Sequence, residues 1–290
     1  MGDGDGATGT RNEVIRTAAI LARGLGTRMR RVDASARLDE AQDAAAASGM
    51  KGMIPIASAS GARTTRPFLD YVLSTLADAG VTDVVLVLGP EHDAVREYYA
   101  RVAPPSRVRV RFALQAAPLG TADAVVAAAQ VVGPASFLVL NADNFYPHAA
   151  LKWLVENNSA ATIAFDRDAL VRDGNIDRER VRAFAVLNVT PDGRLVDIIE
   201  KPGGQLDLDS DAARWVGMNC WAVTPALVNA CTRVPKSVRG EFELPEAVAL
   251  ALREGLEVRA ERMALPVLDL SQRADIPAVV TRLTLVEPHP

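Results

Sequence analysis

Apolar runs that are too short for helices alternate with amphipathic segments along the first half of the chain. Runs of this kind, apolar on both faces and separated by helices, are typical of parallel strands buried beneath helices. The predicted strands are residues 17–21, 83–88, 108–114 and 137–140, and the predicted helices are residues 67–79, 91–101 and 121–131. The pattern predicts an α/β fold with a Rossmann-like mixed, mostly parallel sheet flanked by helices.

The second half of the chain has a different pattern, in which strands follow one another with little helix between them. The predicted strands are residues 162–165, 184–189, 195–199 and 216–223, and the predicted helices are residues 225–231, 244–253 and 276–285. The Pro-Asp-Gly-Arg turn at residues 191–194 predicts a hairpin between the two middle strands. We therefore expect a smaller β-rich lobe at residues 160–235.

No internal repeat or linker divides the chain, so one domain is expected over residues 17–285. The acidic, glycine-rich residues 1–16 predict a flexible tail. Residues 30–50 are rich in alanine and poor in large apolar side chains, which favours an insertion that is mobile or partly helical. We expect this insertion to become at least partly ordered when a nucleotide binds beside it.

The composition excludes several classes of protein. The net charge of −4, without a basic stripe, gives no indication of nucleic-acid binding. No apolar run is long enough to span a bilayer and the N-terminus lacks a signal-peptide pattern, so we expect the cytoplasm and no membrane. The scattered histidines and the two cysteines, which form no CxxC unit, indicate neither a zinc site nor a disulfide framework. The oligomeric state stays open, a homo-oligomer included.

A glycine-containing loop follows the first predicted strand. Gly24 and Gly26 expose backbone N–H groups, and Thr27 and Arg28 add a hydroxyl and a guanidinium, a combination that suits a triphosphate. A dinucleotide-binding loop would need Gly or Ala in place of Met29, and neither a P-loop nor the catalytic motifs of a kinase occur in the chain. An ordinary turn between strand and helix is the alternative for the two glycines alone, and the Thr-Arg pair favours phosphate binding.

Two aspartates and a lysine stand at the ends of predicted strands. Asp143 follows an apolar strand at the edge where open α/β sheets place ligands, and its carboxylate suits a hard cation better than a helix cap. Asp269 also ends an apolar run, but its neighbours leave metal binding and capping equally open. Lys201 precedes a proline that fixes the chain direction, although a solvated lysine is the commoner case.

Two amide side chains are further candidates. Asn219 stands in an otherwise apolar strand, where a buried amide needs partners such as a substrate hydroxyl or a neighbouring backbone group. Gln115, at a strand end, could read the edge of a nucleobase or cap the next helix.

A series of motifs resembles the sugar-1-phosphate nucleotidyltransferases, also called sugar-nucleotide pyrophosphorylases. Residues 21–29, Leu-Ala-Arg-Gly-Leu-Gly-Thr-Arg-Met, resemble the signature loop of that family. The later landmarks are Lys51-Gly-Met-Ile-Pro-Ile, Gln115 with residues 118–124, Asn-Ala-Asp-Asn at 141–144, Ile-Glu-Lys-Pro at 199–202, and the segments 216–224, 240–244 and 267–270. The resemblance rests on their shared order from about residue 18 to residue 278.

The resemblance implies an enzyme with an NTP and a sugar 1-phosphate as substrates and Mg²⁺ as cofactor. The implied catalytic residues are Arg28, Lys51 and Lys201, and the implied magnesium ligands are Asp143 and Asp269. The implied nucleotide-binding residues are Leu21, Ala22, Gly24, Gly26, Thr27, Arg28, Gln115, Gly120 and Thr121. The implied acceptor-binding residues are Asn144, Ala185, Glu200, Lys201 and Asn219.

The chain departs from the family pattern at four places. Arg23 stands where the family usually has Ala or Gly, and the interval between Arg28 and Lys51 is about twice the usual length. Phe-Ala at residues 184–185 replaces the Tyr-Gly of many relatives, and Asn219 replaces a glycine. These departures leave the nucleobase and the acceptor open.

The implied reaction is an in-line displacement at the α-phosphorus of an NTP by a phosphate oxygen of the acceptor, with release of pyrophosphate. A cytidylyltransferase that acts on a non-sugar phosphate such as phosphocholine is the nearest alternative. A catalytically silent subunit that binds nucleotide sugars and regulates a partner is the alternative from another class.

Overall fold

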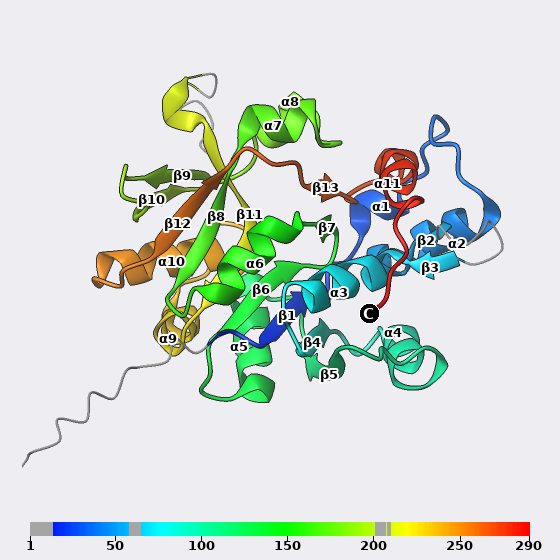
Figure 1. Cartoon of the computed structure of the whole chain (residues 1–290), viewed down its shortest axis with the longest axis horizontal. Coiled ribbons are helices and arrows are strands. Elements are labelled where there is room, and N and C mark those ends of the chain that lie inside the picture. The colour runs from blue at the N-terminus through cyan, green and yellow to red at the C-terminus, as the bar shows by residue number, and fades with distance from the viewer. Residues whose placement is uncertain (1–13, 58–64, 201–206, 208–209) are drawn as a thin grey trace, which may run out of the picture.

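The computed structural model describes residues 14–57, 65–200, 207 and 210–290. Its centre is a nine-stranded sheet in which strands run in the order β10-β9-β11-β6-β1-β4-β5, while β8 pairs with β11 and β12 pairs with β8 (Figure 1). The strands β1 (Thr17–Leu21), β4 (Asp83–Leu88), β5 (Arg109–Leu114) and β6 (Phe137–Asn141) pair in parallel. The parallel half of the sheet confirms the predicted fold class.

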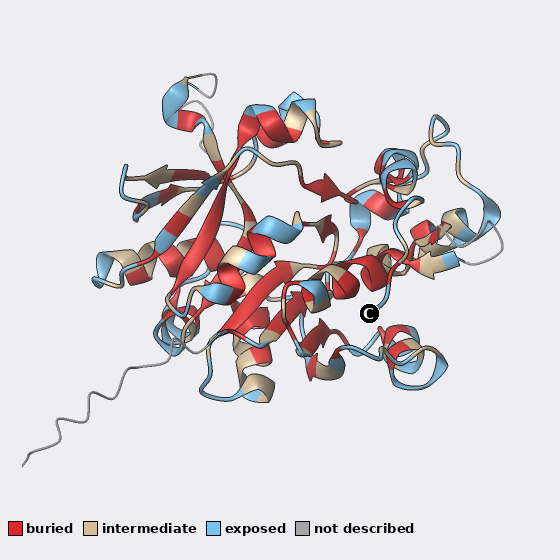
Figure 2. Cartoon of the chain, in the orientation of Figure 1, coloured by how far each residue is buried: buried red, intermediate tan, exposed pale blue. Residues whose placement is uncertain are grey.

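Alternate residues of the parallel strands pack into two separate hydrophobic clusters, one on each face of the sheet. Ile20 and Leu86 join the cluster beneath α3 (Phe68–Asp78), α6 (His148–Glu156) and α11 (Ile276–Leu283). Val85 and Val139 join the cluster beneath α5 (Thr121–Val132), α9 (Pro225–Arg233) and α10 (Leu244–Arg253). Both faces are therefore covered, and the central strands β1, β4 and β6 are almost wholly buried (Figure 2).

The second half of the sheet is mainly antiparallel. It consists of β8 (Ala161–Asp166), β9 (Val186–Val189), β10 (Leu195–Ile199), β11 (Trp215–Val223) and β12 (Arg259–Met263). The β9–β10 pair forms the predicted hairpin, and β11 joins the parallel half by pairing with β6. The sequence did not predict β12, because three of its five residues are charged.

The expectation of little helix between the later strands is wrong. The helices α7 (Arg167–Arg172) and α8 (Arg178–Val181) lie between β8 and β9, each capped by an aspartate side chain, and a 3-10 turn, η4 (Asp211–Ala213), precedes β11. These helices are short and rich in charged residues, so they lack the apolar spacing of a long helix. The helix expected at residues 91–101 is also divided, into α4 (Asp93–Glu97) and a π-helical turn, η2 (Tyr98–Val102).

The insertion at residues 30–50 lies beside the glycine loop and is partly helical. It connects α1 (Thr27–Arg30) to α2 (Glu40–Ser48) and leads into a 3-10 turn, η1 (Lys51–Met53). A capping box between Asp39 and Gln42 starts α2, and Gly49, at a φ of 77°, ends it. Arg273 fixes the insertion from outside by pairing with Asp43. The predicted ordering on nucleotide binding stays a prediction.

Three short elements complete the fold. The hairpin of β2 (Pro55–Ala57) and β3 (Thr65–Pro67) precedes α3. The strands β7 (Asn144–Phe145) and β13 (Leu268–Asp269) pair with each other, and the 3-10 turn η5 (Arg273–Asp275) leads into α11. Residues 1–13 of the predicted tail lie outside the described residues.

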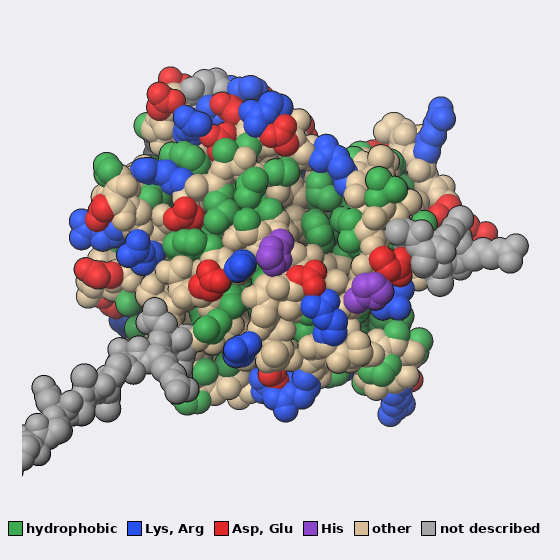
Figure 3. All heavy atoms as spheres, viewed as in Figure 1, with side chains coloured by type: hydrophobic (Ala, Val, Ile, Leu, Met, Phe, Trp, Pro, Cys, Tyr) green, Lys and Arg blue, Asp and Glu red, His purple; other side chains and the backbone are tan. Residues whose placement is uncertain are grey.

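The surface agrees with the composition. Charges of both signs are interspersed on the face shown in Figure 3, without a stripe of one sign. No helix among the residues that the structure describes is long and apolar enough to cross a membrane.

Candidate active site

A cleft of about 540 Å³ lies beyond the carboxyl ends of the parallel strands. The loops after β1, β4, β5 and β6 meet there because parallel strands end at the same edge of the sheet. The predicted residues that line it are Leu21, Ala22, Gly24, Thr27, Arg28, Lys51, Gln115, Gly120, Thr121, Asp143 and Asn219. Residues from distant parts of the sequence therefore share one cavity.

The glycine loop depends on Gly26, which does not line the cleft but supports it. Gly26 has a φ of 62°, and a Cβ at this position would lie 2.4 Å from the carbonyl oxygen of Gly49. A Cβ at Gly24, by contrast, would meet no atom within 4 Å. The backbone conformation and the close packing therefore both require glycine at position 26, whereas position 24 has room for a side chain.

Arg28, the cation predicted to bind the triphosphate, is free to bind a ligand. Among the described residues, the Arg28 guanidinium makes no hydrogen bond or ion pair, whereas Arg30, two residues later, donates to the carbonyl of Ser48 at 2.9 Å. Arg28 therefore lies at the cleft with its donors uncommitted, which suits a multivalent anion.

Lys51 reaches the same cleft in spite of the long interval that precedes it. The insertion folds back so that Gly49 packs on Gly26, and η1 then places Lys51 Nζ 2.6 Å from Asp143 Oδ2. The two side chains are 17% and 24% exposed, so the ion pair stays accessible from the cleft. The extra residues have not displaced this lysine from the predicted site.

Strand pairing brings Asp269 beside Asp143. In the β7–β13 pair Asp269 stands opposite Asn144, and the Leu270 N–H donates to the Asp143 carbonyl at 2.8 Å. The Asp269 carboxylate accepts hydrogen bonds from Ser271 Oγ at 2.6 Å and from Arg180 Nη2 at 2.7 Å. Burial, together with the neighbouring charge of Asp143, raises the pKa of Asp269 to about 6.

The two aspartates fit a magnesium ion that takes most of its ligands from elsewhere. Among the described residues no three His, Cys, Asp or Glu side chains converge, so the protein would supply two carboxylates and leave the other positions to phosphates and water. Asp143 is open to the cleft, whereas Asp269 is only 5% exposed. Each Asp269 oxygen already accepts one hydrogen bond and keeps a second lone pair for a cation.

The opposite end of the cleft is built from the loop after β5. Gln115 donates through Nε2 to the Gly120 carbonyl at 3.0 Å and to Asp123 at 2.8 Å, so its nitrogen holds the start of α5. Gly120 has a φ of 110°, and a Cβ there would lie 2.4 Å from the Phe242 carbonyl oxygen. The loop is therefore pressed closely against the segment before α10.

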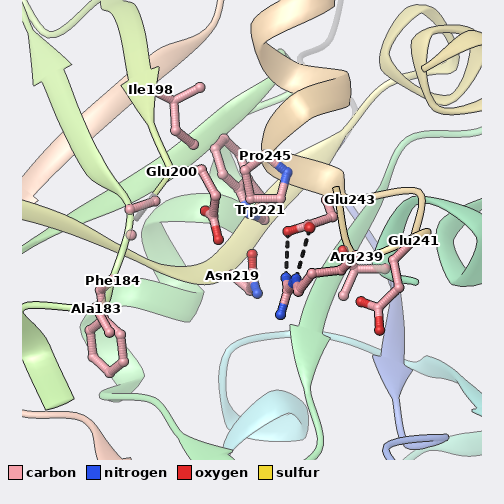
Figure 4. A pocket seen from close by; sticks show the side chains of 13 residues that line it. Ala183, Phe184, Ile198, Glu200, Asn219, Trp221, Arg239, Glu241, Glu243 and Pro245 are labelled. Atoms are coloured by element: carbon pink, nitrogen blue, oxygen red, sulfur yellow. Dashed lines mark hydrogen bonds and ion pairs between the residues drawn. The ribbon is translucent and has the colours of Figure 1, made fainter. Parts of the chain in front are cut away.

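A second cavity of about 170 Å³ adjoins the cleft and shares Thr121, Asn219, Arg239 and Glu241 with it. Figure 4 shows its side chains converging from β10, β11 and the segment before α10. Of the predicted acceptor residues, Ala185, Glu200 and Asn219 line this cavity.

The other two predicted acceptor residues are placed differently. Asn144 is buried and lines neither cavity, and its Oδ1 accepts a hydrogen bond from Asn141 Nδ2 at 3.1 Å. Lys201 lies outside the described residues.

Asn219 has an unusual backbone at the junction of the cavities. Its φ of 51° is the only left-handed one of a non-glycine residue in the described part of the chain. The register of β11 shifts between Gly217 and Trp221, and the Tyr146 hydroxyl supports the bulge by donating to the Met218 carbonyl at 2.7 Å. Asparagine tolerates this conformation better than most side chains, so the fold keeps an amide here.

Sequence reasoning missed Arg239. Its guanidinium binds both oxygens of Glu243, at 3.2 and 2.7 Å, and lines both cavities (Figure 4). An arginine in a loop has no local pattern that separates it from a surface arginine. Its only signal was its position one residue before the 240–244 landmark.

Residues 54–258 match the family model described as nucleotidyl transferase. The chain belongs to that family. The matched span leaves out the glycine loop and Asp269. The structure places the glycine loop at the same cleft as Gln115 and Asp143, and it places Asp269 beside Asp143.

Curated relatives agree with this assignment. A glucose-1-phosphate thymidylyltransferase from Streptomyces griseus is 28% identical over 245 residues, which cover 84% of this chain and 59% of the relative. A UTP–glucose-1-phosphate uridylyltransferase from Haloferax volcanii is 26% identical over 247 residues, which cover 85% of this chain and 87% of the relative. The chain spans 59% and 53% of the lengths of the first two curated relatives that it matches.

Solved structures confirm the fold. The UTP-bound UGPase from Acinetobacter baumannii superimposes with a TM-score of 0.69 at 20% identity, covering 94% of this chain and 95% of that one. A UDP-glucose pyrophosphorylase complexed with UDP-glucose superimposes with the same TM-score at 14% identity, covering 92% and 98%.

Proposed function

We propose that this protein transfers a nucleoside monophosphate from an NTP to a sugar 1-phosphate, releasing pyrophosphate and forming an NDP-sugar. The observation that carries the proposal is the shared wall of the two cavities. A cleft with Arg28, Lys51 and Asp143 opens beside a smaller cavity with Glu200 and Asn219. Two substrates bound in these cavities would meet at their common wall. The names of the curated relatives support the same chemistry.

The nucleotide would lie along the cleft with its base at the Gln115–Thr121 end. The backbone N–H groups of the glycine loop, together with Arg28 and Lys51, would bind the triphosphate and stabilise the departing pyrophosphate. Glu200 would accept hydrogen bonds from hydroxyl groups of the sugar, and the amide of Asn219 would donate to them or accept from them. The assignment of Lys201 to the acceptor phosphate rests on the sequence motif alone.

The reaction needs no covalent enzyme intermediate. A phosphate oxygen of the acceptor forms a bond to the α-phosphorus while the bond from that phosphorus to the bridging oxygen of pyrophosphate breaks. The acceptor phosphate is already ionised, so no strong general base is required. The residues of the chain then act by positioning the two phosphates and by compensating their charge.

Asp143 and Asp269 would hold Mg²⁺ at the α-phosphate, where the ion supplies further charge neutralisation. Arg180 and Ser271 fix the Asp269 carboxylate, and Lys51 balances the charge of Asp143. We place the reaction in the cytoplasm, where NTPs are supplied.

A panel of NTPs and phosphorylated acceptors, with released pyrophosphate measured in the presence of Mg²⁺, tests the proposal. Turnover that requires an NTP and a sugar 1-phosphate together is the expected result. Turnover with CTP and phosphocholine alone would instead identify a cytidylyltransferase of non-sugar phosphates. Binding of NDP-sugars without turnover of any pair would identify a silent regulatory subunit.

A further inference from the structure

Arg23 has an unusual environment in the nucleotide cleft. Its side chain is only 8% exposed and lines the cleft directly after β1. Its Nη2 approaches the Ala116 carbonyl at 3.4 Å and Glu91 Oε1 at 3.5 Å, both at the long limit for such contacts. Its Nε and Nη1 are covered by protein atoms and have no acceptor. A buried guanidinium with two unmatched nitrogen atoms is unfavourable unless a ligand completes it.

The loop after β4 leaves room for this guanidinium. A Cβ at Gly89 would lie 2.4 Å from Arg23 Nε and 2.4 Å from a carboxylate oxygen of Glu91. The Gly89 N–H donates to His92 Nδ1 at 3.2 Å, and Arg96 donates to the Gly89 carbonyl at 3.1 Å. Hydrogen bonds therefore hold the loop at Gly89 in place. Because Gly89 has no side chain, the space beside it accommodates the Arg23–Glu91 pair.

The position of Arg23 separates it from the cations of the triphosphate end. Its contacts come from the loops after β4 and β5, the same side of the cleft as Gln115 and Pro118. Lys51 lies instead at Asp143, after β6. A guanidinium beside the Gln115 loop would face the base of a nucleotide bound as proposed above.

We propose that Arg23 selects the nucleobase, by turning from its incomplete contacts and donating hydrogen bonds to a keto oxygen of the base. The inference rests on the proposed function. Uracil, thymine and guanine present keto oxygens that accept from a guanidinium, whereas adenine has no keto oxygen, carries an amino donor in its place and accepts only through its ring nitrogens. The side chain thus favours keto bases over adenine.

The test compares wild-type protein with Arg23→Ala and Arg23→Lys, using UTP, dTTP, GTP and ATP with one acceptor. Arg23→Ala should lower the ratio of kcat/KM for the best keto NTP to that for ATP by roughly tenfold or more. Arg23→Lys, with a smaller donor set, should fall between. The KM of the acceptor should stay unchanged in both variants, because Arg23 does not line the acceptor cavity.

Glu91→Gln is the matched control, since it removes the charge that pairs with Arg23 but leaves the guanidinium in place. It should keep the selectivity ratio. Equal losses with every NTP, accompanied by weaker inhibition by pyrophosphate in Arg23→Ala, would show a phosphate contact and overturn the proposal. An unchanged ratio would overturn it as well.

Calorimetric binding of UMP and AMP separates this proposal from the proposed function. The wild-type protein could turn over no pair of substrates but still bind UMP more tightly than AMP. If that difference in affinity is lost in Arg23→Ala, the proposed function is overturned and the role of Arg23 is kept. Equal UMP and AMP affinities in wild-type and variant would overturn the role of Arg23, whatever the turnover.

Discussion

The cleft proposed to bind the nucleotide and the smaller cavity proposed to bind the acceptor are built in different ways. The cleft lies at the ends of parallel strands, and short contiguous motifs after β1, β5 and β6 supply most of its polar groups. The smaller cavity is lined by Thr121 and by residues from four further segments, which are 183–185, 198–200, 217–221 and 239–245. The site at the edge of the parallel sheet is thus determined largely by the fold. The lining of the smaller cavity is determined by individual side chains, each of which can be substituted separately.

This difference has a consequence for specificity. Backbone groups and a few cations bind a triphosphate, whatever the base and whatever the acceptor. In the proposed function the identity of the acceptor would depend instead on side chains that line the smaller cavity, such as Phe184, Asn219 and Trp221. Changes to the phosphate-binding groups of the cleft should therefore lower turnover with every substrate, and changes in the cavity should alter acceptor preference. The predictions below test that division.

The largest expected effect concerns Asp143 and Asp269. Changing either to alanine should lower kcat on the order of a thousandfold, because a shared Mg²⁺ supplies several kcal/mol of transition-state stabilisation and each 1.36 kcal/mol is a factor of ten. The double variant should be scarcely worse than the worse single variant, since both act on one ion. Steady-state kinetics over a Mg²⁺ titration measures this.

Asp275→Asn is the matched control, because Asp275 also pairs with Arg180, at 2.6 Å, but lies in η5, outside the β7–β13 pair that brings Asp269 beside Asp143. It should reproduce any structural loss caused by freeing Arg180 while keeping most of the turnover. If Asp269→Ala retains near-normal kcat and Mg²⁺ dependence, the two-carboxylate site is wrong and Asp143 must act with another ligand.

The sequence predicted the parallel half closely. The bounds of β1 and β4 coincide with the predicted strands, since four or five consecutive apolar residues beneath two helical layers leave little ambiguity. Gln115 and Asp143 could be predicted as site residues because each follows the end of a predicted strand. Charged strands such as β12 and short helices such as α7 carry no comparable periodicity.

The rest of the site depended on tertiary contacts. Asp269 lies beside Asp143 only because β13 pairs with β7, two strands of two residues each that are far apart in the sequence. Arg239 enters both cavities through the docking of its loop, in which Phe242 N–H donates to the Leu119 carbonyl at 2.7 Å. Local sequence patterns contain neither contact.

The second prediction separates the two glycines of the loop. Gly26→Ala should lower the free energy of unfolding by about 1–3 kcal/mol and weaken NTP binding, because the φ of 62° and the contact with Gly49 both oppose a Cβ. Gly24→Ala should leave thermal stability nearly unchanged, since its Cβ would meet no atom within 4 Å. Thermal unfolding and NTP titration measure the pair. Equal stability losses in both variants would show that the close packing on Gly49 is unimportant.

The third prediction addresses the acceptor cavity. Asn219→Gly keeps the left-handed backbone and removes the amide, so stability should change by less than about 1 kcal/mol. The acceptor KM should rise about two- to tenfold, the equivalent of one lost hydrogen bond, while the NTP KM changes little. Kinetics with each substrate varied in turn measures the split. A loss that appears only in the NTP KM would place Asn219 in the nucleotide half of the site and break the proposed division.

The smallest expected effect concerns the insertion, which belongs to neither half of the comparison. Its helix α2 has one buried residue, Ala46, and is fixed mainly by Arg273, which pairs with the largely exposed Asp43, and by Arg30, which donates to the Ser48 carbonyl. So few contacts predict opening of low free energy. Because Gly49 and Met50 line the cleft, a bound NTP should slow hydrogen exchange across residues 40–50. Asp43→Asn should speed exchange there by a few-fold without NTP, as expected for one partly exposed ion pair, and NTP should restore the protection. Equal, strong protection with and without NTP would show that the insertion is a fixed part of the cleft wall, which would make the nucleotide half as rigid as the sheet that carries it.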